Sequence, residues 1–506
     1  MKLISAAFGL PHAFAELQAD FAICVDGNRI VAAGARDDLR AQYPLADHEH
    51  FDCALMLPGL VNSHDHGRGL GTASLGIPDD DLETWLLWLS AQPHIEPYLA
   101  AAYDGVRLLR AGVTATAHSH NPRDWRNMAK EATATLRGYR DAGIRVAFHA
   151  PIVDQNLLVY AVSQDEEENF ITRLPAELRA MAHTMSKPAL SHDEYFALCD
   201  RLFERYHDAA HHMAHIQVSP AGGQWCSDAL ISRAVEWACA RDTRVQMHML
   251  ETQPQRDYAF RKWGKSFIRH LDDIGALGPW LTLAHMVWVE PEDLSLLAER
   301  SVAIIHNPSS NLRLRSGIAP LAAMLAAGVT VGIGLDGHAL DDDQDYLREM
   351  RLAWMLSNLW AGLSATRFDR QVASVEARRV LHLGSRGGAI VTFGANVALG
   401  TLAVGNLADF VLLDLDFVPH DGRSPADDWI VCLLHLATRQ HVRCVMADGE
   451  WVVRDGCATR LDEAALRAEI AASIRASDRS WGCDPHQLQH LAAHIRQFNQ
   501  KHRLRN

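Results

Sequence analysis

The sequence lacks the features that mark secreted and membrane-spanning proteins. No run of about 18 apolar residues is long enough to cross a bilayer. The short apolar run near the start soon meets Pro11 and His12, and it does not resemble a secretory signal. The nine cysteines are odd in number, dispersed and without CxxC spacing, a pattern that favours a reducing compartment. We therefore expect a cytoplasmic protein with no membrane partner.

The sequence also has no concentrated block of lysine and arginine. Its formal net charge of −14 argues against a nucleic-acid partner, and an anionic substrate would need local positive groups. Hydrophobic residues make up 48% and charged residues 22% of the chain, as in ordinary soluble proteins. Its 506 residues have room for a barrel of about 250 residues and a smaller domain. The expected partner is a small-molecule substrate.

Two histidines spaced one residue apart follow the apolar run at 57–61. In an extended strand, residues i and i+2 project to the same face, so His64 and His66 can offer two imidazoles to one cation while Asp65 points away. Because the chain has 28 histidines, an isolated pair would be as compatible with ordinary surface or core histidines. The rest of the sequence decides between these readings.

Further metal-type residues stand at the ends of other short apolar runs. The run at 245–250 delivers His248 and then Glu251, the run at 281–284 delivers His285, and the run at 329–335 delivers Asp336. Three nitrogens and one oxygen suit zinc or ferrous iron, and water would complete an open catalytic site. The four predicted ligands of this single divalent ion are His64, His66, His248 and Asp336.

Alternating apolar runs and amphipathic stretches predict repeated strand–helix units and a parallel sheet. Helical patterns such as 97–111 and 228–240 separate the runs. We place eight strands, which end near His66, His120, Asp154, Pro220, His248, His285, Asn307 and Asp336. In a (β/α)8 TIM barrel the catalytic groups sit at the carboxyl ends of the strands, where these polar residues fall. The predicted fold class is therefore α/β, with a (β/α)8 barrel.

Several longer motifs carry a family resemblance that spans nearly the whole chain. They are PGLVNSHDH at 58–66, HMLET at 248–252, HNPSSNLRLRSGIAP at 306–320, LDGHALDDDQDYLREMRLAW at 335–354, and the segments 400–411 and 445–453. Together they resemble the amidohydrolase superfamily, in the aminohydrolase and chlorohydrolase branch that includes cytosine, guanine and S-adenosylhomocysteine deaminases and the s-triazine hydrolases. The resemblance implies a barrel flanked by a discontinuous β-sandwich domain, and a homodimer.

The domain boundaries follow from that resemblance and from a hairpin pattern around Asp26 to Arg29. Residues 1–57 are expected to form the first part of the β-sandwich domain and 390–460 the second part. The barrel would occupy 58–389, and 461–506 would form a helical extension, solvated or in a dimer contact. The long connection at 155–212 is either a lid over the substrate or an ordinary pair of surface helices.

Catalytic roles are assigned to Glu251, His285 and Asp336. Glu251 lies three residues beyond His248 and can act as a general base that passes a water proton to the leaving nitrogen. Its alternative is a structural ion pair. The resemblance places a histidine at His285 that orients the nucleophile or polarises the substrate, unless it is a buried structural residue. Asp336 would direct the attack. Two-metal members of the family that the chain resembles use a carboxylated lysine on the fourth strand, and the matching stretch at 215–220 has no lysine, so the resemblance implies one metal rather than two.

Substrate contacts are harder to assign because the pocket segments depart from the deaminase motifs. Arg68 can pair with an acceptor on the ligand, and Gln224 or Trp225 can bind or stack on a planar ring, although a structural loop is an equal contender for each. His118 and His120 repeat the HxH spacing, but the resemblance gives the second strand no metal role, so they are expected to contact substrate or line the pocket rather than bind metal. Asn311 is expected to shape the site.

The sequence thus predicts a metal-dependent hydrolase. In the leading hypothesis, a metal-activated hydroxide attacks an amino-substituted carbon of a nitrogen heterocycle and releases ammonia or an amine. The alternative is hydrolysis of an exocyclic amide, urea or carbamate by the same site. A non-catalytic binding protein of this fold would be expected to have lost a ligand or Glu251, and the set is complete.

Overall fold

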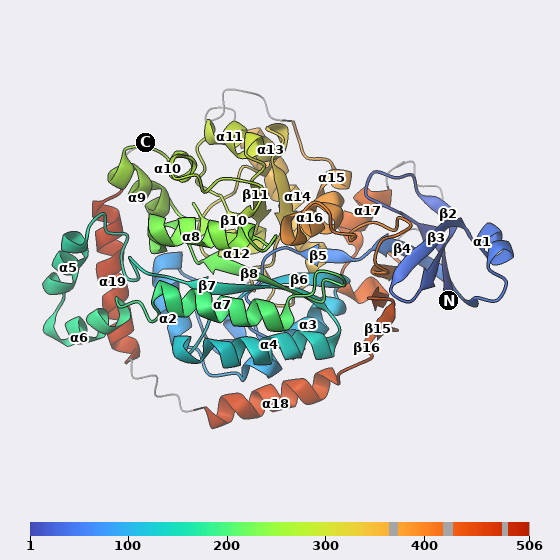
Figure 1. Cartoon of the computed structure of the whole chain (residues 1–506), viewed down its shortest axis with the longest axis horizontal. Helices are drawn as coiled ribbons and strands as arrows, with labels where there is room; N and C mark the ends of the chain where they lie inside the picture. Colours follow the sequence, from blue (N-terminus) through green and yellow to red (C-terminus); the bar gives the residue numbers. More distant parts are fainter. Residues whose placement is uncertain (338, 364–372, 418–428, 478–483, 505–506) are drawn as a thin grey trace.

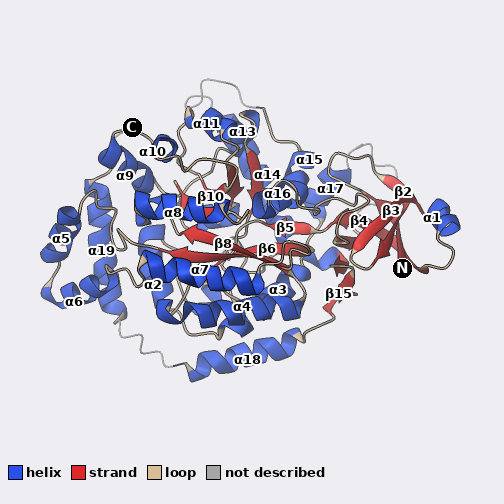
Figure 2. Ribbon diagram, in the orientation of Figure 1, coloured by secondary structure: helices blue, strands red, loops and turns tan. Residues whose placement is uncertain are grey.

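Two sheets of eight strands organise the molecule (Figure 1, Figure 2). The computed structural model describes residues 1–337, 339–363, 373–417, 429–477 and 484–504. One sheet is the parallel core of the larger body, surrounded by helices, and the other lies to its side near the N-terminus (Figure 2). Within the described ranges, no helix is both long and apolar enough to cross a membrane.

The parallel sheet runs in chain order through eight short strands. They are β5 (Leu60–Asn62), β6 (Val113–Ser119), β7 (Arg145–Ile152), β8 (Ala214–Pro220), β9 (Val245–Met249), β10 (Leu281–His285), β11 (Ala303–His306) and β12 (Thr330–Ile333). Backbone hydrogen bonds from Ser63 N to Ile333 O and from Asp336 N to His64 O bring β12 back to β5. The strands are almost wholly buried, as expected for a parallel sheet covered on both faces. The predicted barrel is confirmed.

Helices follow the strands in the alternation that the sequence predicts, and the predicted helices at 97–111 and 228–240 are present as α3 and α8. The helices are α1 (Arg36–Gln42), α2 (Leu82–Ser90), α3 (Pro97–Leu109), α4 (Met128–Ala142), α5 (Gln164–Arg173), α6 (Ala176–Met185), α7 (His192–Tyr206), α8 (Asp228–Cys239), α9 (Gln253–Trp263), α10 (Phe267–Asp273), α11 (Asp293–Glu299), α12 (Pro308–Arg313), α13 (Leu321–Ala326), α14 (Tyr346–Leu363), α15 (Ala377–His382), α16 (Gly388–Phe393), α17 (Trp429–Leu436), α18 (Glu463–Ala476) and α19 (Pro485–Lys501).

The first barrel strand is shorter than its apolar run suggests. β5 ends at Asn62, so His64 and His66 lie beyond the strand rather than in it. The cause is local, because the buried Asp65 carboxylate accepts the backbone N–H groups of His66 and Gly67 and the amide of Asn62. Such side-chain bonds to the backbone replace ladder bonds and end a strand. The His64 and His66 imidazoles still point toward one place, because the chain bends after β5 rather than because alternate residues of a strand share a face.

The flanking domain is one continuous mixed sheet built from both ends of the chain. Its hydrogen-bonding order is β16-β15-β14-β13-β4-β1-β2-β3, with β1 (Lys2–Gly9), β2 (Gln18–Asp26), β3 (Arg29–Ala35), β4 (Asp47–Pro58), β13 (Phe410–Asp414), β14 (Val442–Ala447), β15 (Glu450–Arg454) and β16 (Cys457–Ala458). The predicted hairpin is the antiparallel pair β2–β3. β4 pairs with β13 in the middle of the sheet, so the two chain ends meet there.

The joint between the barrel and this sheet is a buried ion-pair network. Arg145, fully buried at the start of β7, donates two hydrogen bonds of 2.9 Å to the Asp409 carboxylate and one of 3.0 Å to Asp448. Asp409 precedes β13 and Asp448 lies in the β14–β15 turn. Since buried charges are tolerated only when paired, this network fixes the sheet to the barrel.

The segment 155–212 holds α5, α6 and α7 (Figure 1). Apolar residues of α5 and α6 pack against one face of the C-terminal helix α19, in a cluster that includes Ile171, Leu178, Leu491 and Ile495. Leu87 of α2 joins the same cluster, so the predicted helical extension is tied to the barrel face. The eight described cysteines are free thiols, and Cys483 lies outside the described residues.

Candidate metal centre

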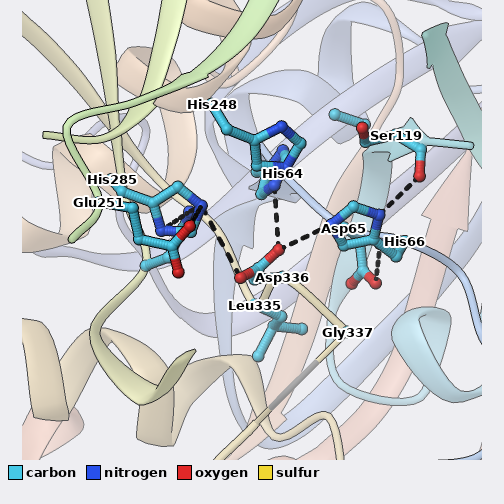
Figure 3. Close-up of polar contacts among 12 residues, drawn as sticks. His64, Asp65, His66, Ser119, His248, Glu251, His285, Leu335, Asp336 and Gly337 are labelled. Carbon is cyan, nitrogen blue, oxygen red and sulfur yellow. Dashed lines mark hydrogen bonds and ion pairs between the residues drawn. The ribbon is translucent and has the colours of Figure 1, made fainter. Parts of the chain in front are cut away.

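Four side chains from three barrel segments converge at the carboxyl end of the sheet (Figure 3). They are the four predicted ligands, and one donor atom from each lies within 4.8 Å of the others. Asp336 Oδ1 is 3.0 Å from His64 Nε2 and 3.0 Å from His66 Nε2. No other group of three or more histidine, cysteine or acidic residues in the described ranges has this geometry.

Each histidine of the group is oriented by an oxygen behind it. His64 Nδ1 lies 2.7 Å from Gln246 Oε1, His66 Nδ1 lies 2.8 Å from Ser119 O, and His248 Nδ1 lies 2.5 Å from Ala221 O. These oxygens accept, so each Nδ1 carries the hydrogen and each Nε2 turns a lone pair toward the centre. This arrangement of outer partners is the one that metal-binding histidines show.

The electrostatics of the centre also suit a cation. His64 Nε2 and Asp336 Oδ1 are both buried acceptors without a hydrogen-bond partner among the described residues, and they face each other. Burial lowers the pKa of His66 to about 4 and that of His248 well below its usual range. Burial would raise the pKa of Asp336, but a positive charge on the His64 ring outweighs it, so the ionised carboxylate needs a positive charge beside it, either a proton on His64 or a metal ion. Neutral imidazoles and an ionised carboxylate are the forms that bind metal.

Glu251 lies beside this group on the turn that follows β9 (Figure 3). Its carboxylate is 2% exposed, and burial, with the carboxylates of Asp336 and Glu83 nearby, raises its pKa well above the usual range. Ser316 Oγ donates a hydrogen bond of 3.4 Å to it. A carboxyl group held at high proton affinity next to a metal site has the properties of a general acid–base.

His285 ends β10 and faces both acids. Its Nε2 is 3.6 Å from Glu251 Oε2 and 3.9 Å from Asp336 Oδ2, so it stands outside the four-ligand group. Asn311 Oδ1 lies 3.0 Å from Nδ1 and fixes the ring. Burial lowers the pKa of His285 to about 4, which keeps the imidazole neutral. Asn311 therefore contacts a predicted catalytic residue directly.

The backbone at the strand ends adopts conformations that are uncommon for these residue types. Leu250, His285 and Asp336 have positive φ angles of 50°, 78° and 61°. Such conformations persist only where the surrounding structure imposes them, and they concentrate at functional sites. Close packing also explains Gly334, where an added Cβ would lie 2.5 Å from Asn307 Oδ1 and 2.7 Å from the Cβ of His64.

A cavity of about 470 Å³ reaches the metal centre at His66. Predicted substrate residues Arg68, His118 and His120 line it. Arg68 donates to the backbone oxygen of Asp336 at 3.2 Å, and its guanidinium lies 5.3 Å from the centre of the Trp85 ring. The volume is in the range of small-molecule sites.

The other predicted substrate residues lie elsewhere. Gln224 is fully buried after β8, and neither atom of its side-chain amide has a hydrogen-bond partner in the described structure. Trp225 is half-buried, with its ring 6.2 Å from that of Tyr160. Neither residue lines the 470 Å³ cavity, so their contact with substrate stays a prediction.

Several residues of the site escaped the sequence analysis. Gln246 holds His64, Ser316 contacts Glu251, and Glu83 accepts a hydrogen bond of 2.5 Å from Thr252 next to Glu251. A signal existed for Ser316, which lies inside the motif at 306–320. Glu83 stands in an ordinary helical pattern, and nothing in the sequence indicates that it lies close to Glu251.

Comparison with known proteins identifies the family. A model of the amidohydrolase family matches residues 55–452. The chain belongs to the amidohydrolase family. A second model, for a bacterial imidazolonepropionase-like composite domain, matches residues 22–46 within the flanking sheet. The predicted family and hydrolase class are confirmed.

Individual members of the amidohydrolase family resemble the chain over most of its length. A 5-methylthioadenosine/S-adenosylhomocysteine deaminase of Halobacterium salinarum is 30% identical over 470 residues, covering 90% of this chain and 95% of the relative. An 8-oxoguanine deaminase of Pseudomonas aeruginosa is 29% identical over 471 residues, covering 91% and 95%. The crystal structure of a zinc-bound adenosine deaminase from Xanthomonas campestris has a TM-score of 0.73 and 26% identity, covering 94% and 98%.

Proposed function

We propose that this amidohydrolase is a deaminase, which replaces an amino group on a nitrogen heterocycle by oxygen and releases ammonia or an amine. The observation that carries the proposal is Glu251, a buried carboxyl of raised pKa beside a complete set of metal ligands. An amino leaving group must be protonated before it departs, whereas a halide need not be. A retained proton carrier therefore favours an amino leaving group.

His64, His66, His248 and Asp336 would hold one divalent cation, with zinc as the proposed ion and ferrous iron as the alternative. When bound, the cation supplies a water molecule that loses a proton near neutral pH. The zinc-bound adenosine deaminase of the same fold supports this choice of metal.

The residues of the chain then move one proton. Glu251 accepts it from the attacking water and delivers it to the leaving nitrogen, so that the carbon–oxygen bond forms and the carbon–nitrogen bond breaks. An NH2 group gains one water proton and leaves as ammonia, while the second water proton stays with the oxo product. His285, neutral and held by Asn311, stands 3.6 Å from Glu251 and would donate to or orient the reacting groups.

Location and assembly are part of the proposal. The free thiols of the described cysteines support a reducing cytoplasm. A homodimer is proposed by family analogy, and sedimentation velocity would measure the state directly.

The test is a panel of aminopurines, aminopyrimidines, aminotriazines, pterins, aryl amides and ureas, incubated with zinc-loaded protein and resolved by mass spectrometry. We expect replacement of a ring amino group by oxygen. Glu251→Gln should retain metal but lose at least about a hundredfold in turnover. The matched control Glu236→Gln, at an exposed position on α8, should keep full turnover.

The outcomes separate the candidate reactions. Cleavage only of bonds between acyl carbon and nitrogen would replace the proposal by the amide or urea hydrolase. Wild-type rates in Glu251→Gln would contradict the assignment of the proton carrier. Silence across the panel with metal bound, together with ligand binding that does not depend on Glu251, would favour the non-catalytic binding protein.

A further inference from the structure

A second cavity, of about 310 Å³, lies on the Glu251 side of the metal centre. Thr252, which follows Glu251 in the chain, lines this cavity, and so does Ser316, which donates a hydrogen bond to the Glu251 carboxylate. The volume is at the lower end of the range for small-molecule sites. The cavity is therefore next to the group that is proposed to carry the reacting proton.

The C-terminal helix α19 forms one wall of this cavity, through Arg496 and Asn499. The helix crosses the end of the barrel opposite the flanking sheet (Figure 1). Arg496 donates a hydrogen bond of 3.3 Å to the Thr84 hydroxyl at the start of α2. The backbone N–H of Leu504 donates one of 3.1 Å to the Asp257 carboxylate of α9. These bonds to two different helices fix the wall in place.

The charged side chains around the cavity are already engaged with other groups. Thr252 donates a hydrogen bond of 2.5 Å to the Glu83 carboxylate, and burial raises the Glu83 pKa. Burial also raises the pKa of Asp257, and its neighbours, Arg256 and Arg503 among them, oppose the rise. A charged ligand group would have to compete with an existing pair. The other ion pairs at the cavity join Arg315 to Asp80, and Arg496 to Asp80 and Asp81.

Two carboxamide side chains of the lining have no such partner. Gln253, the first residue of α9, is 8% exposed, and Asn499 of α19 is half-buried. Both line the cavity, and neither side chain makes a hydrogen bond to another residue in the described ranges. Burying an amide costs free energy unless a ligand or water pairs with it. Each amide offers N–H donors and an oxygen acceptor to whatever enters.

We propose that this cavity binds a neutral hydrogen-bonding arm of the substrate, a hydroxyl or carboxamide group, and that Gln253 and Asn499 determine specificity for it. Two carboxamides match a group that both donates and accepts. The inference rests on the proposed function and narrows its substrate class to amino-substituted heterocycles that carry such an arm. Asn499 lies after residues 55–452, which the family model matches, so the family match alone does not supply this contact.

The experiment compares matched ligands by isothermal titration calorimetry. Aminopyrimidines, aminotriazines and aminopurines are prepared with a hydroxyalkyl, carboxamide, alkyl, carboxylate or ammonium arm of similar length, attached to the ring or to the amino nitrogen. They are titrated into zinc-loaded Glu251→Gln protein. We expect a hydroxyl or carboxamide arm to bind about fivefold tighter than the alkyl arm, the effect of one neutral hydrogen bond. The charged arms should bind less tightly than the neutral polar arms.

Two further substitutions assign the preference to the cavity. Gln253→Met and Asn499→Leu remove the amide and nearly keep the side-chain volume. Each should abolish most of the preference for the polar arm and leave binding of the alkyl arm unchanged. The two variants test the subsite independently, because they lie on different helices. Gln497→Leu is the control, because Gln497 is exposed on α19 and does not line this cavity.

Equal affinity for the hydroxyl, carboxamide and alkyl arms in every series would overturn the inference, as would tightest binding of a charged arm. A preference that survives unchanged in both Gln253→Met and Asn499→Leu would also overturn it.

Turnover of the same compounds by wild-type protein tests the proposed function separately, and product masses show whether the arm stays with the ring or leaves with the amine. Deamination without the arm preference leaves the function standing and removes the subsite. Arm preference without deamination does the reverse. Absence of both binding and turnover would overturn both.

Discussion

The barrel carries a histidine cluster at each end, and the two clusters have opposite hydrogen patterns. At the carboxyl end, His64, His66 and His248 donate through Nδ1 to oxygens behind them and turn Nε2 lone pairs inward. At the amino end, His207 Nδ1 accepts the backbone N–H of Ile216 at 3.2 Å, and His215 Nδ1 accepts from Gln217 Nε2 at 3.3 Å. The hydrogens of the neutral His207 and His215 rings therefore sit on Nε2.

The difference shows that proximity of imidazoles does not make a metal site. The His207 and His215 ring centres are 4.2 Å apart, closer than any pair of rings at the metal centre. His212 is the third ring of this cluster, 5.7 Å from His215. Burial and then the Arg145 guanidinium lower its pKa, while Asp208 raises it. Among the described residues, no carboxylate lies within ion-pair distance of the three rings. The outer hydrogen bonds and a shared carboxylate decide which cluster can hold a cation.

Removing one histidine from each cluster tests most directly whether only the cluster at the carboxyl end binds metal. His248→Ala should reduce zinc from about one equivalent per chain to near zero, because a four-ligand site loses an imidazole. His215→Ala should leave the zinc content unchanged. Plasma mass spectrometry of gel-filtered protein measures both. Metal lost from His215→Ala and retained by His248→Ala would reverse the assignment.

Arg145, at the amino end of the barrel, joins the barrel to the flanking sheet. Its replacement should therefore lower the stability of the protein and leave its metal content unchanged. Arg145→Met leaves the Asp409 carboxylate buried and unpaired, and we expect the free energy of unfolding to fall by about 3–5 kcal/mol. Arg140→Met removes an exposed arginine, 70% accessible, and should cost less than about 1 kcal/mol. Urea unfolding measures both variants. Equal losses of unfolding free energy in the two variants would show that the buried Arg145 network stabilises the fold no more than an exposed arginine does.

The smallest effect concerns the pH dependence of stability. Burial lowers the pKa of His207, His212 and His215, so below about pH 6.5 the unfolded chain binds more protons than the folded one. Stability should therefore fall as the pH falls from 7 toward 5. His215→Gln should flatten this slope in urea midpoints measured at successive pH values, by less than the Arg145→Met loss. An identical slope in the variant would exclude the cluster as its source.

The barrel and the grouping of the four candidate ligands could be predicted because they depend on short-range pattern. Apolar runs of strand length end in His248, His285 and Asp336, and parallel strands bring their carboxyl ends together whatever the helices between them contain. The position of Glu251, three residues after His248, suggested it as the proton carrier, and the family resemblance suggested a role for His285; both roles stay predictions. Neither source needed a contact between distant residues to be known in advance.

The remaining features depend on contacts between residues that are distant in the sequence, and the periodicity of the sequence does not predict such contacts. Gln246 meets His64 across the barrel, and Glu131 meets His120 only because the intervening loop folds back. The end of β5 at Asn62 depends on where the Asp65 side chain points. The packing of α19 against α5 and α6 joins segments separated by nearly the whole barrel.

Because β4 leads directly into β5, the flanking sheet and the barrel are linked during synthesis, while the chain is still folding. β4 ends at Pro58, β5 begins at Leu60, and β4 finds its partner β13 only from Phe410 onward. During synthesis His64, His66, His248 and Asp336 all emerge before that partner strand exists. The segment that carries His64 and His66 therefore stays next to an unfinished sheet edge until residues 410–414 have left the ribosome. Such long-range pairing folds late and exposes nascent chains to misassembly.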